Sequence, residues 1–239
     1  MVNMKKEIEN TNDTSVSQLD ELISNCMQSG FTIIGGRPGT GKTSLLLDIV
    51  SRALLKNPPI PTLIFSLEMK KEHILSRLFK VKGDVYQEDN LEFLHIEDSF
   101  LSTGDICLPS ILDISSKIKS LNDSLDKKLG LIVIDCLQLI NNVNKNNPRK
   151  EEVAEILKTL KNLAKDLNVP IISSAMLKRD EGVKPSVADF REVDNIEQYA
   201  DNIVLLYRII HADFYKNKKM ARSMYLNLNK TFGTFENIE

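Results

Sequence analysis

The residues best suited to chemistry are eight consecutive positions that read Gly36-Arg37-Pro38-Gly39-Thr40-Gly41-Lys42-Thr43. They match the phosphate-loop pattern, in which a glycine and four intervening residues are followed by Gly-Lys and then serine or threonine. Glycine lets the backbone curl until several N–H groups point into one concavity, which suits a polyphosphate. The alternative is an ordinary glycine-rich turn between a strand and a helix.

Each part of this loop has its own expected role. Lys42 can reach the β- and γ-phosphates of a nucleotide and act in catalysis there, and the Thr43 hydroxyl can ligate Mg²⁺. The expected cofactors are therefore ATP and Mg²⁺. The residues expected to bind the nucleotide are Gly36, Arg37, Pro38, Gly39, Thr40, Gly41, Lys42, Thr43 and Ser44.

Two carboxylates follow predicted buried strands. Asp135 ends the apolar run Leu129–Ile134, and Glu68 follows the strand Thr62–Ser66. Because the carboxyl ends of parallel strands meet at one edge of a sheet, both side chains are expected on the same edge as the phosphate loop. Asp135 could hold Mg²⁺ there through water, opposite Thr43. An aspartate that only starts a turn is the alternative.

Glu68 has two interpretations of equal weight from its position alone. As a catalytic base, it would orient and deprotonate the water that attacks the γ-phosphate. As a structural acid, it would stabilise the N-terminus of a predicted helix, Lys70–Phe79, through the helix dipole.

The elements that must position these residues alternate along the chain. The apolar run Phe31–Ile34 predicts a strand before the loop, and Ser44–Val50 predicts an amphipathic helix after it. Such alternation indicates βαβ units, and so an α/β fold with a mostly parallel central sheet flanked by helices. The other predicted helices are Thr14–Gly30, Ser110–Leu121 and Arg149–Leu167. The other predicted strands are Leu91–Ile96, Pro170–Ser174, Asn202–Tyr207 and Met224–Leu228. The predicted loops are Lys80–Asn90 and Lys216–Lys219.

Composition sets broad limits on the class of protein. A chain of 239 residues with 42% hydrophobic and 27% charged residues suits one large α/β domain. We expect a polar arm over residues 1–13 and a single domain over residues 14–239. The net charge of −2 argues against non-specific coating of DNA, although a locally basic channel remains compatible with it.

Cysteine usage and hydropathy bear on the compartment. Cys26, Cys107 and Cys136 have neither metal-type spacing nor a disulfide framework, so we expect reduced thiols in a cytoplasmic protein. Residues 1–13 are too polar for a signal peptide. No apolar run approaches the length that spans a bilayer, and no membrane partner is expected.

Together the motifs resemble the C-terminal, RecA-like ATPase domain of the DnaB family of replicative DNA helicases. The resemblance runs from about Thr14 to Tyr207, and its second and last motifs are the most specific. The motifs are GGRPGTGKTSL, FSLEM at Phe65–Met69, LGLIVIDCLQLI at Leu129–Ile140, LKTLKNLAKDLNVPII at Leu157–Ile172 and DFREVDNIEQYAD at Asp189–Asp201.

The resemblance implies a RecA-like P-loop NTPase that forms a hexameric ring around single-stranded DNA, with ATP between neighbouring subunits. It implies that Glu68 is the catalytic base and that Asp135 is the second Mg²⁺ group. It places Arg191 and Glu192 in a segment that faces DNA, although from spacing alone a solvated surface is favoured. The family usually carries an N-terminal helical domain, and a lone motor-type domain is expected here.

The chain departs from the family's pattern in three places. Met176 stands where the family has a glutamine that senses the γ-phosphate and links hydrolysis to the DNA loop, and a thioether cannot donate that hydrogen bond. Asp194 replaces a glycine whose backbone approaches DNA phosphate. Where the family supplies a Lys-x-Arg pair to the neighbour's ATP site, this chain offers Lys230 without an arginine. Lys178 and Arg179 are candidates for DNA contact, or for compensating Met176 at a phosphate.

Two functional hypotheses follow. The first is an ATP hydrolase of DNA replication with helicase activity, whose partners are single-stranded DNA, copies of itself and replication proteins. The second is a nucleotide-dependent binding or assembly module that has lost processive unwinding. A recombination ATPase is a third possibility, against which the FSLEM motif argues.

Overall fold

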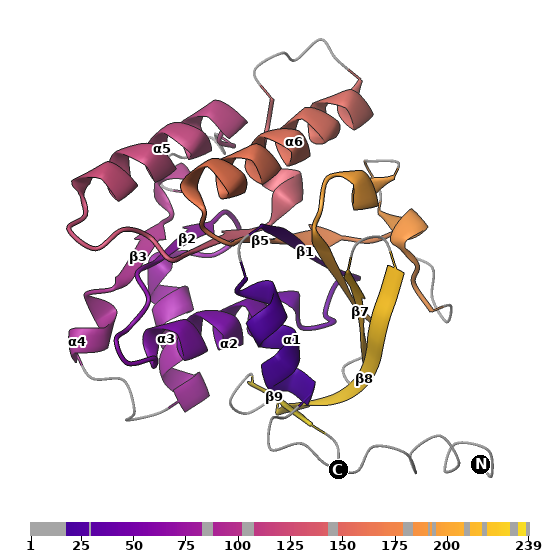
Figure 1. Ribbon diagram of the computed structural model, residues 1–239, viewed down its shortest axis with the longest axis horizontal. Helices are drawn as coiled ribbons and strands as arrows, with labels where there is room; N and C mark the ends of the chain where they lie inside the picture. Colours follow the sequence, from indigo (N-terminus) through magenta and orange to yellow (C-terminus); the bar gives the residue numbers. More distant parts are fainter. Residues whose placement is uncertain are drawn as a thin grey trace.

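The computed structural model places a helix-flanked β-sheet at the centre of the molecule (Figure 1). The predicted polar arm, residues 1–13, lies outside the described part of the chain. The structure describes residues 18–28, 30–82, 88–101, 108–142, 148–178, 184–190, 192, 195–207, 211–216, 219–229 and 234–237.

Among these residues, nine strands form the sheet in the order β3-β2-β4-β5-β1-β6-β7-β8-β9. The strands from β3 to β6 run parallel to their neighbours, which confirms the predicted α/β fold with a mostly parallel sheet. The last strands continue the sheet antiparallel. The bounds are β1 (Phe31–Gly36), β2 (Thr62–Ser66), β3 (Leu94–Glu97), β4 (Leu131–Asp135), β5 (Ile171–Met176), β6 (Asn202–Leu206), β7 (His211–Lys216), β8 (Lys219–Asn229) and β9 (Thr234–Asn237).

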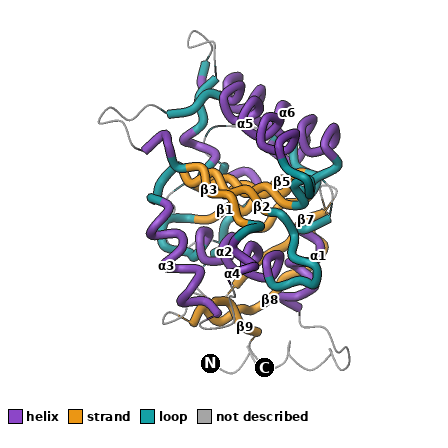
Figure 2. Tube along the Cα trace, turned by 90° about the vertical axis from the view of Figure 1, so that its left-hand side faces the viewer, coloured by secondary structure: helices purple, strands orange, loops and turns teal. Residues whose placement is uncertain are grey.

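Helices cover both faces of the parallel part of the sheet (Figures 1 and 2). Helices α1, α2 and α3 lie on one face, and α5 and α6 lie on the other. The helices are α1 (Gln18–Cys26), α2 (Lys42–Leu54), α3 (Lys71–Lys82), α4 (Glu88–Leu91), α5 (Ile111–Ser124) and α6 (Arg149–Leu167), with 3₁₀ turns η2 (Ser99–Leu101), η3 (Leu137–Leu139), η4 (Val187–Asp189) and η5 (Ile196–Gln198).

The alternation of side chains along each strand builds two hydrophobic cores. In β4, Leu131 and Val133 pack with α1, α2 and α3, whereas Ile132 and Ile134 pack with α5 and α6. Successive side chains of a strand point to opposite faces, so a strand covered on both faces must be apolar at every position. This explains why the central strands are continuous apolar runs.

The predicted boundaries differ from the observed ones mainly in short or polar segments. The helix predicted over Arg149–Leu167 is confirmed at both ends. The predicted loop Lys80–Asn90 is wrong at its ends, because α3 continues to Lys82 and α4 begins at Glu88. The strand predicted from Leu91 begins only at Leu94, and Lys216 and Lys219 belong to strands β7 and β8.

One carboxylate ties together the starts of β1 and β6 and helix α6. Asp201, which precedes β6, accepts a hydrogen bond from the buried N–H of Phe31 at 2.9 Å. Its other oxygen lies 3.0 Å from the Lys161 ammonium of α6. Gly30 makes room for it, because a Cβ at Gly30 would lie 2.8 Å from the carboxylate. The last residue of the DFREVDNIEQYAD motif therefore positions β1, the strand that leads into the phosphate loop.

Replacing Asp201 with alanine is expected to lower the free energy of unfolding by about 2 kcal/mol, since a buried N–H left without an acceptor costs about 1–3 kcal/mol. Chemical denaturation of wild type and variant measures this loss. Asp166→Ala on the exposed side of α6 is the matched control. Equal stabilities for the two variants would contradict the assigned role of Asp201.

Candidate active site

The phosphate loop joins the end of β1 at Gly36 to the start of α2 at Lys42. Gly39 has φ 77° and Gly41 has φ 91°, in the left-handed region that favours glycine. A Cβ at Gly39 would meet nothing within 4 Å, so conformation and not space requires glycine there. The Thr40 hydroxyl donates to the Arg37 carbonyl at 2.8 Å and closes the turn. The backbone thus forms the curl that the motif predicts, with the N-terminus of α2 behind it.

Lys42 is folded over the loop that it follows. Its ammonium donates to the carbonyl oxygens of Gly36 at 3.0 Å and Arg37 at 3.2 Å. Burial lowers the pKa of Lys42, while the nearby Asp135, Cys136 and Glu68 oppose that shift. A half-buried cation held over a loop of backbone N–H groups is suited to an anion such as a polyphosphate.

The structure brings Thr43 and Asp135 together, as the sequence predicts. The Thr43 hydroxyl, in the first turn of α2, donates to Asp135 Oδ2 at 2.7 Å, across from the end of β4. The Ser174 hydroxyl of β5 donates to the other carboxylate oxygen, Oδ1. Asp135 is buried, and its two oxygens are held in fixed directions by hydroxyls from two different elements. This contact joins β4, β5 and α2 at one edge of the sheet.

The Thr43 and Asp135 oxygens fit Mg²⁺. Hydroxyl and carboxylate oxygens are hard ligands, and Mg²⁺ in phosphate-binding sites takes only one or two protein ligands, with water and phosphate completing its shell. Among the described residues there is no group of three or more His, Cys, Asp or Glu side chains that could hold a metal ion. Thr43 and Asp135 are therefore the residues that would hold the ion beside a bound phosphate.

Glu68 lies at the same edge, just after β2. Its carboxylate accepts a hydrogen bond from the Cys136 thiol at 3.1 Å, and the Leu67 N–H donates to the Asp135 carbonyl at 2.8 Å. Burial, followed by the negative charge of Glu68, raises the pKa of Cys136 far above its ordinary value. The thiol consequently keeps its proton and acts as a donor that orients Glu68. The side chain of Glu68 remains solvent-exposed and able to reach water.

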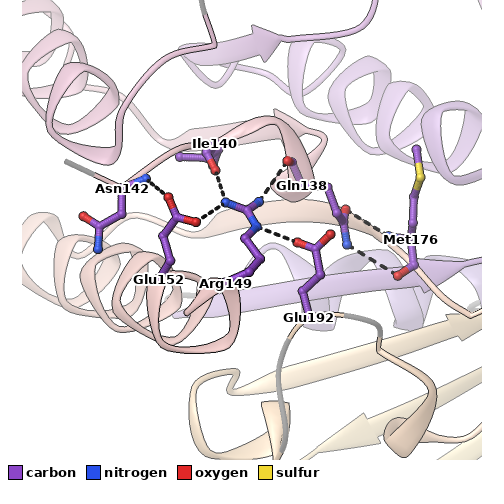
Figure 3. A network of polar contacts seen from close by, with 7 residues as sticks. All are labelled: Gln138, Ile140, Asn142, Arg149, Glu152, Met176 and Glu192. Atoms are coloured by element: carbon purple, nitrogen blue, oxygen red, sulfur yellow. Dashed lines mark hydrogen bonds and ion pairs between the residues drawn. The ribbon is translucent and has the colours of Figure 1, made fainter. Parts of the chain in front are cut away.

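The end of β5 completes the edge at the position where the sequence has Met176. Met176 pairs with Gly36 in the register of β5 and β1. Its N–H donates to Gln138 Oε1 at 3.1 Å, and Gln138 Nε2 donates to its carbonyl at 3.4 Å (Figure 3). The Gln138 side chain thus pairs with the backbone of Met176 much as a neighbouring strand would.

The residues predicted to contact DNA are only partly described. Lys178 is exposed, and its carbonyl, not its ammonium, meets the phosphate loop by accepting from Arg37 Nε at 3.2 Å. Glu192 accepts from Arg149 Nε at 3.0 Å, away from the loop. The remaining candidates for DNA contact, Arg179 and Arg191, lie outside the described residues. So do the departure at Asp194 and Lys230, the candidate for the neighbour's ATP site.

The sequence predicts no role for several residues of the site. Ser174, Cys136, Gln138 and Arg149 make the contacts that hold the predicted residues in place. Cys136 and Gln138 lie in the motif Leu129–Ile140, directly after Asp135 and just beyond it, and that position is the sequence signal for them. None of the helices described is long and apolar enough to cross a membrane.

Comparisons of this chain with known proteins all point to the same family. The model of the family described as DnaB-like helicase C terminal domain matches residues 12–231. The chain is 33% identical over 231 residues to a probable replicative DNA helicase of Trieres chinensis, covering 89% of this chain and 50% of that protein. It is 33% identical over 224 residues to the replicative DNA helicase DnaB of Geobacillus stearothermophilus, covering 86% and 48%. The chain spans about half the length of these curated relatives.

Solved structures show the same fold. One of them, an ATPase domain, superposes with a TM-score of 0.72 at 24% identity, covering 88% of this chain and 85% of that one. A DnaB-like replicative helicase, solved in a study of its interactions with primase, superposes with a TM-score of 0.71 at 23% identity, covering 88% and 57%. With the family model matching most of its length, this chain belongs to the DnaB-like helicase C-terminal domain family.

Proposed function

We propose that this chain is the ATP-hydrolysing motor domain of a replicative DNA helicase. The observation that carries the proposal is the contact between Thr43 and Asp135, which joins a phosphate loop to a buried strand-end carboxylate. Glu68 lies at the same edge, tied to this pair through Cys136. Phosphoryl transfer requires mainly positioning and electrostatic stabilisation, and these residues provide both.

Each residue has a task in this proposal. The loop N–H groups and Lys42 bind the phosphates of ATP and offset the charge that develops on the γ-phosphate. Thr43 and Asp135 hold Mg²⁺, which supplies charge neutralisation when it is bound. Glu68, oriented by the Cys136 thiol, accepts the proton of the attacking water.

The proposal includes partners suggested by the relatives. We propose that copies of the chain assemble into a hexameric ring around single-stranded DNA, in which residues 14–239 act as one domain and Arg191 faces the DNA. Replication proteins, with a primase as the first candidate, would bind the ring. The buried free thiols of Cys26 and Cys136 suit the reducing cytoplasm.

Steady-state ATP hydrolysis, measured with and without single-stranded DNA, tests the proposal. We expect turnover that requires Mg²⁺, stops when EDTA is added, and rises with DNA. Strand separation on a forked duplex then measures unwinding. A chain that neither binds nor hydrolyses ATP would overturn the assignment.

Met176 supports a second candidate, a nucleotide-dependent assembly module. Met176, at the end of β5, is in register with Gly36 of the phosphate loop, and its thioether cannot donate a hydrogen bond to a γ-phosphate. In this candidate, ATP binding holds an oligomer or recruits a partner without processive unwinding. Nucleotide-dependent assembly with slow, DNA-independent turnover would favour it over the helicase.

A further inference from the structure

Arg149, the first residue of α6, joins three separate segments through its guanidinium (Figure 3). Its Nε donates to Glu192 at 3.0 Å, and Nη1 donates to Glu152 at 2.7 Å. Nη1 also donates to the Ile140 carbonyl at 3.3 Å, and Nη2 donates to the Gln138 carbonyl at 3.0 Å. The planar fork of arginine matches such a set of acceptors, and a lysine ammonium does not.

Gln138 extends these contacts to the end of β5. Its backbone carbonyl accepts from Arg149, while its side-chain amide pairs with both the N–H and the carbonyl of Met176. A single residue of the η3 turn, just after β4, therefore contacts α6 on one side and β5 on the other. A shift of Arg149 would displace the η3 turn and the amide that holds Met176.

The end of β5 is in turn bonded to the phosphate loop. Met176 is in register with Gly36, and the Leu177 N–H donates to the Gly36 carbonyl at 3.3 Å. One residue further on, the Lys178 carbonyl accepts from Arg37 Nε at 3.2 Å. The polar contacts therefore form a continuous series from Glu192 through Arg149, Gln138 and Met176 to the phosphate loop.

We propose that Arg149 is a positioning residue that couples the segment around Glu192 to the nucleotide site, with Gln138 as the intermediate. This rests on the proposed function, in which that segment faces DNA and the loop binds ATP. Position 176 carries no side-chain amide in this chain, but the amide of Gln138 is hydrogen-bonded to the N–H and the carbonyl of Met176. The link to the DNA-facing segment then passes through Arg149.

Stability alone gives little reason for this arrangement. The side chains of Arg149 and Glu192 are 34% and 30% exposed, and ion pairs with that much access to solvent contribute little to folding. Glu152, three residues further along α6, already pairs with Arg149. Removing the Glu192 side of this pair is therefore expected to change coupling between the two sites more than it changes the folded state.

The test measures coupling directly, as the ratio of the dissociation constants for single-stranded DNA without and with a non-hydrolysable ATP analogue and Mg²⁺. Coupling between sites is typically about 5-fold to 150-fold. In full-length Arg149→Gln we expect this ratio to fall to within about twofold of one, with the affinity for the analogue alone kept within about threefold. Arg149→Lys should keep part of the coupling at most, because the charge remains and the fork is lost.

Lys161→Gln is the matched control. Lys161 lies on the same helix, its ion pair with Asp201 has the same 3.0 Å length, and it anchors the other end of the motif that contains Glu192. We expect Lys161→Gln to keep the coupling ratio of wild type. If Lys161→Gln lost as much coupling as Arg149→Gln, the route through Gln138 would be overturned. Any contact that holds the Asp189–Asp201 motif against α6 would then explain the loss in both variants.

A double-mutant cycle completes the test. Glu192→Gln should lower the ratio as Arg149→Gln does, and the double variant should lower it no further. Unchanged coupling in folded Arg149→Gln and Glu192→Gln would overturn the proposal. Should Arg149→Gln unfold, Glu192→Gln alone decides, since it leaves the contacts of Arg149 with Glu152 and the carbonyls intact. A wild-type chain that binds neither ligand would instead defeat the proposed function itself.

Discussion

Replacing Lys42 with alanine is expected to weaken nucleotide binding and to slow ATP hydrolysis by at least about 100-fold, the typical effect on turnover of losing one preorganised donor. The ammonium is held over the phosphate loop by the carbonyls of Gly36 and Arg37, and the truncated side chain leaves that position without a positive charge. Equilibrium binding of a fluorescent ATP analogue and steady-state turnover measure the two losses.

Lys56→Ala is the control for the loss of Lys42. Lys56 is exposed just beyond the end of α2. The Lys56→Ala variant therefore removes one positive charge, as Lys42→Ala does, but at the other end of the helix. We expect wild-type binding and turnover in this control. Wild-type turnover in Lys42→Ala would remove the phosphate loop from the site and with it the proposed function.

Replacing Glu68 with glutamine is expected to keep nucleotide binding and to slow hydrolysis by about 10²-fold to 10⁴-fold, the usual contribution of a general base. Glutamine has the shape of glutamate and its carbonyl oxygen can still accept the hydrogen bond from the Cys136 thiol, so the geometry is preserved. What it lacks is the ability to take a proton from water. Single-turnover hydrolysis and analogue binding separate the two effects.

Glu72→Gln distinguishes a base from a structural acid. Glu72 is exposed in the first turn of α3, where an acid stabilises the helix through its dipole and has no access to the candidate site. If Glu68 were only such an acid, Glu68→Gln and Glu72→Gln would both lose a little stability and keep full turnover. Normal hydrolysis in Glu68→Gln would move the base to another residue.

The sequence predicts those parts of the fold whose signals are local. The helix Arg149–Leu167 has a long apolar stripe and is found with the predicted bounds, and the loop glycines adopt the backbone that the motif requires. Strand β1 continues past its predicted end because Gly35 and Gly36 pair with β5 on one side and β6 on the other. Gly35 is also packed against Phe190, where a Cβ would lie 2.6 Å from the ring. That contact joins residues far apart in the sequence, and no local pattern encodes it.

Strand β7 is likewise defined by contacts between distant residues and not by a local sequence pattern. His211–Lys216 has no regular alternation of apolar and polar residues, and its pairing with β6 and β8 places it in the sheet. The supporting residues of the site are equally hidden, since the contact of Cys136 with Glu68 and that of Arg149 with Glu192 span long stretches of chain. The motifs predict roles for the reactive residues of such a site, whereas the contacts of the residues that position them are seen only in the folded structure.

The order of strands has a consequence for how copies of this domain can meet. In the described part of the chain, the sheet begins with β3 and ends with β9, and each of these strands is four residues long. An edge strand offers its unpaired N–H and C=O groups to any second sheet, and a short edge offers few of them. Joining two copies edge to edge is thereby disfavoured, so subunits of a ring would have to recognise one another through side chains and loops. Contacts of that kind can loosen and re-form during a reaction cycle, as a shared sheet could not.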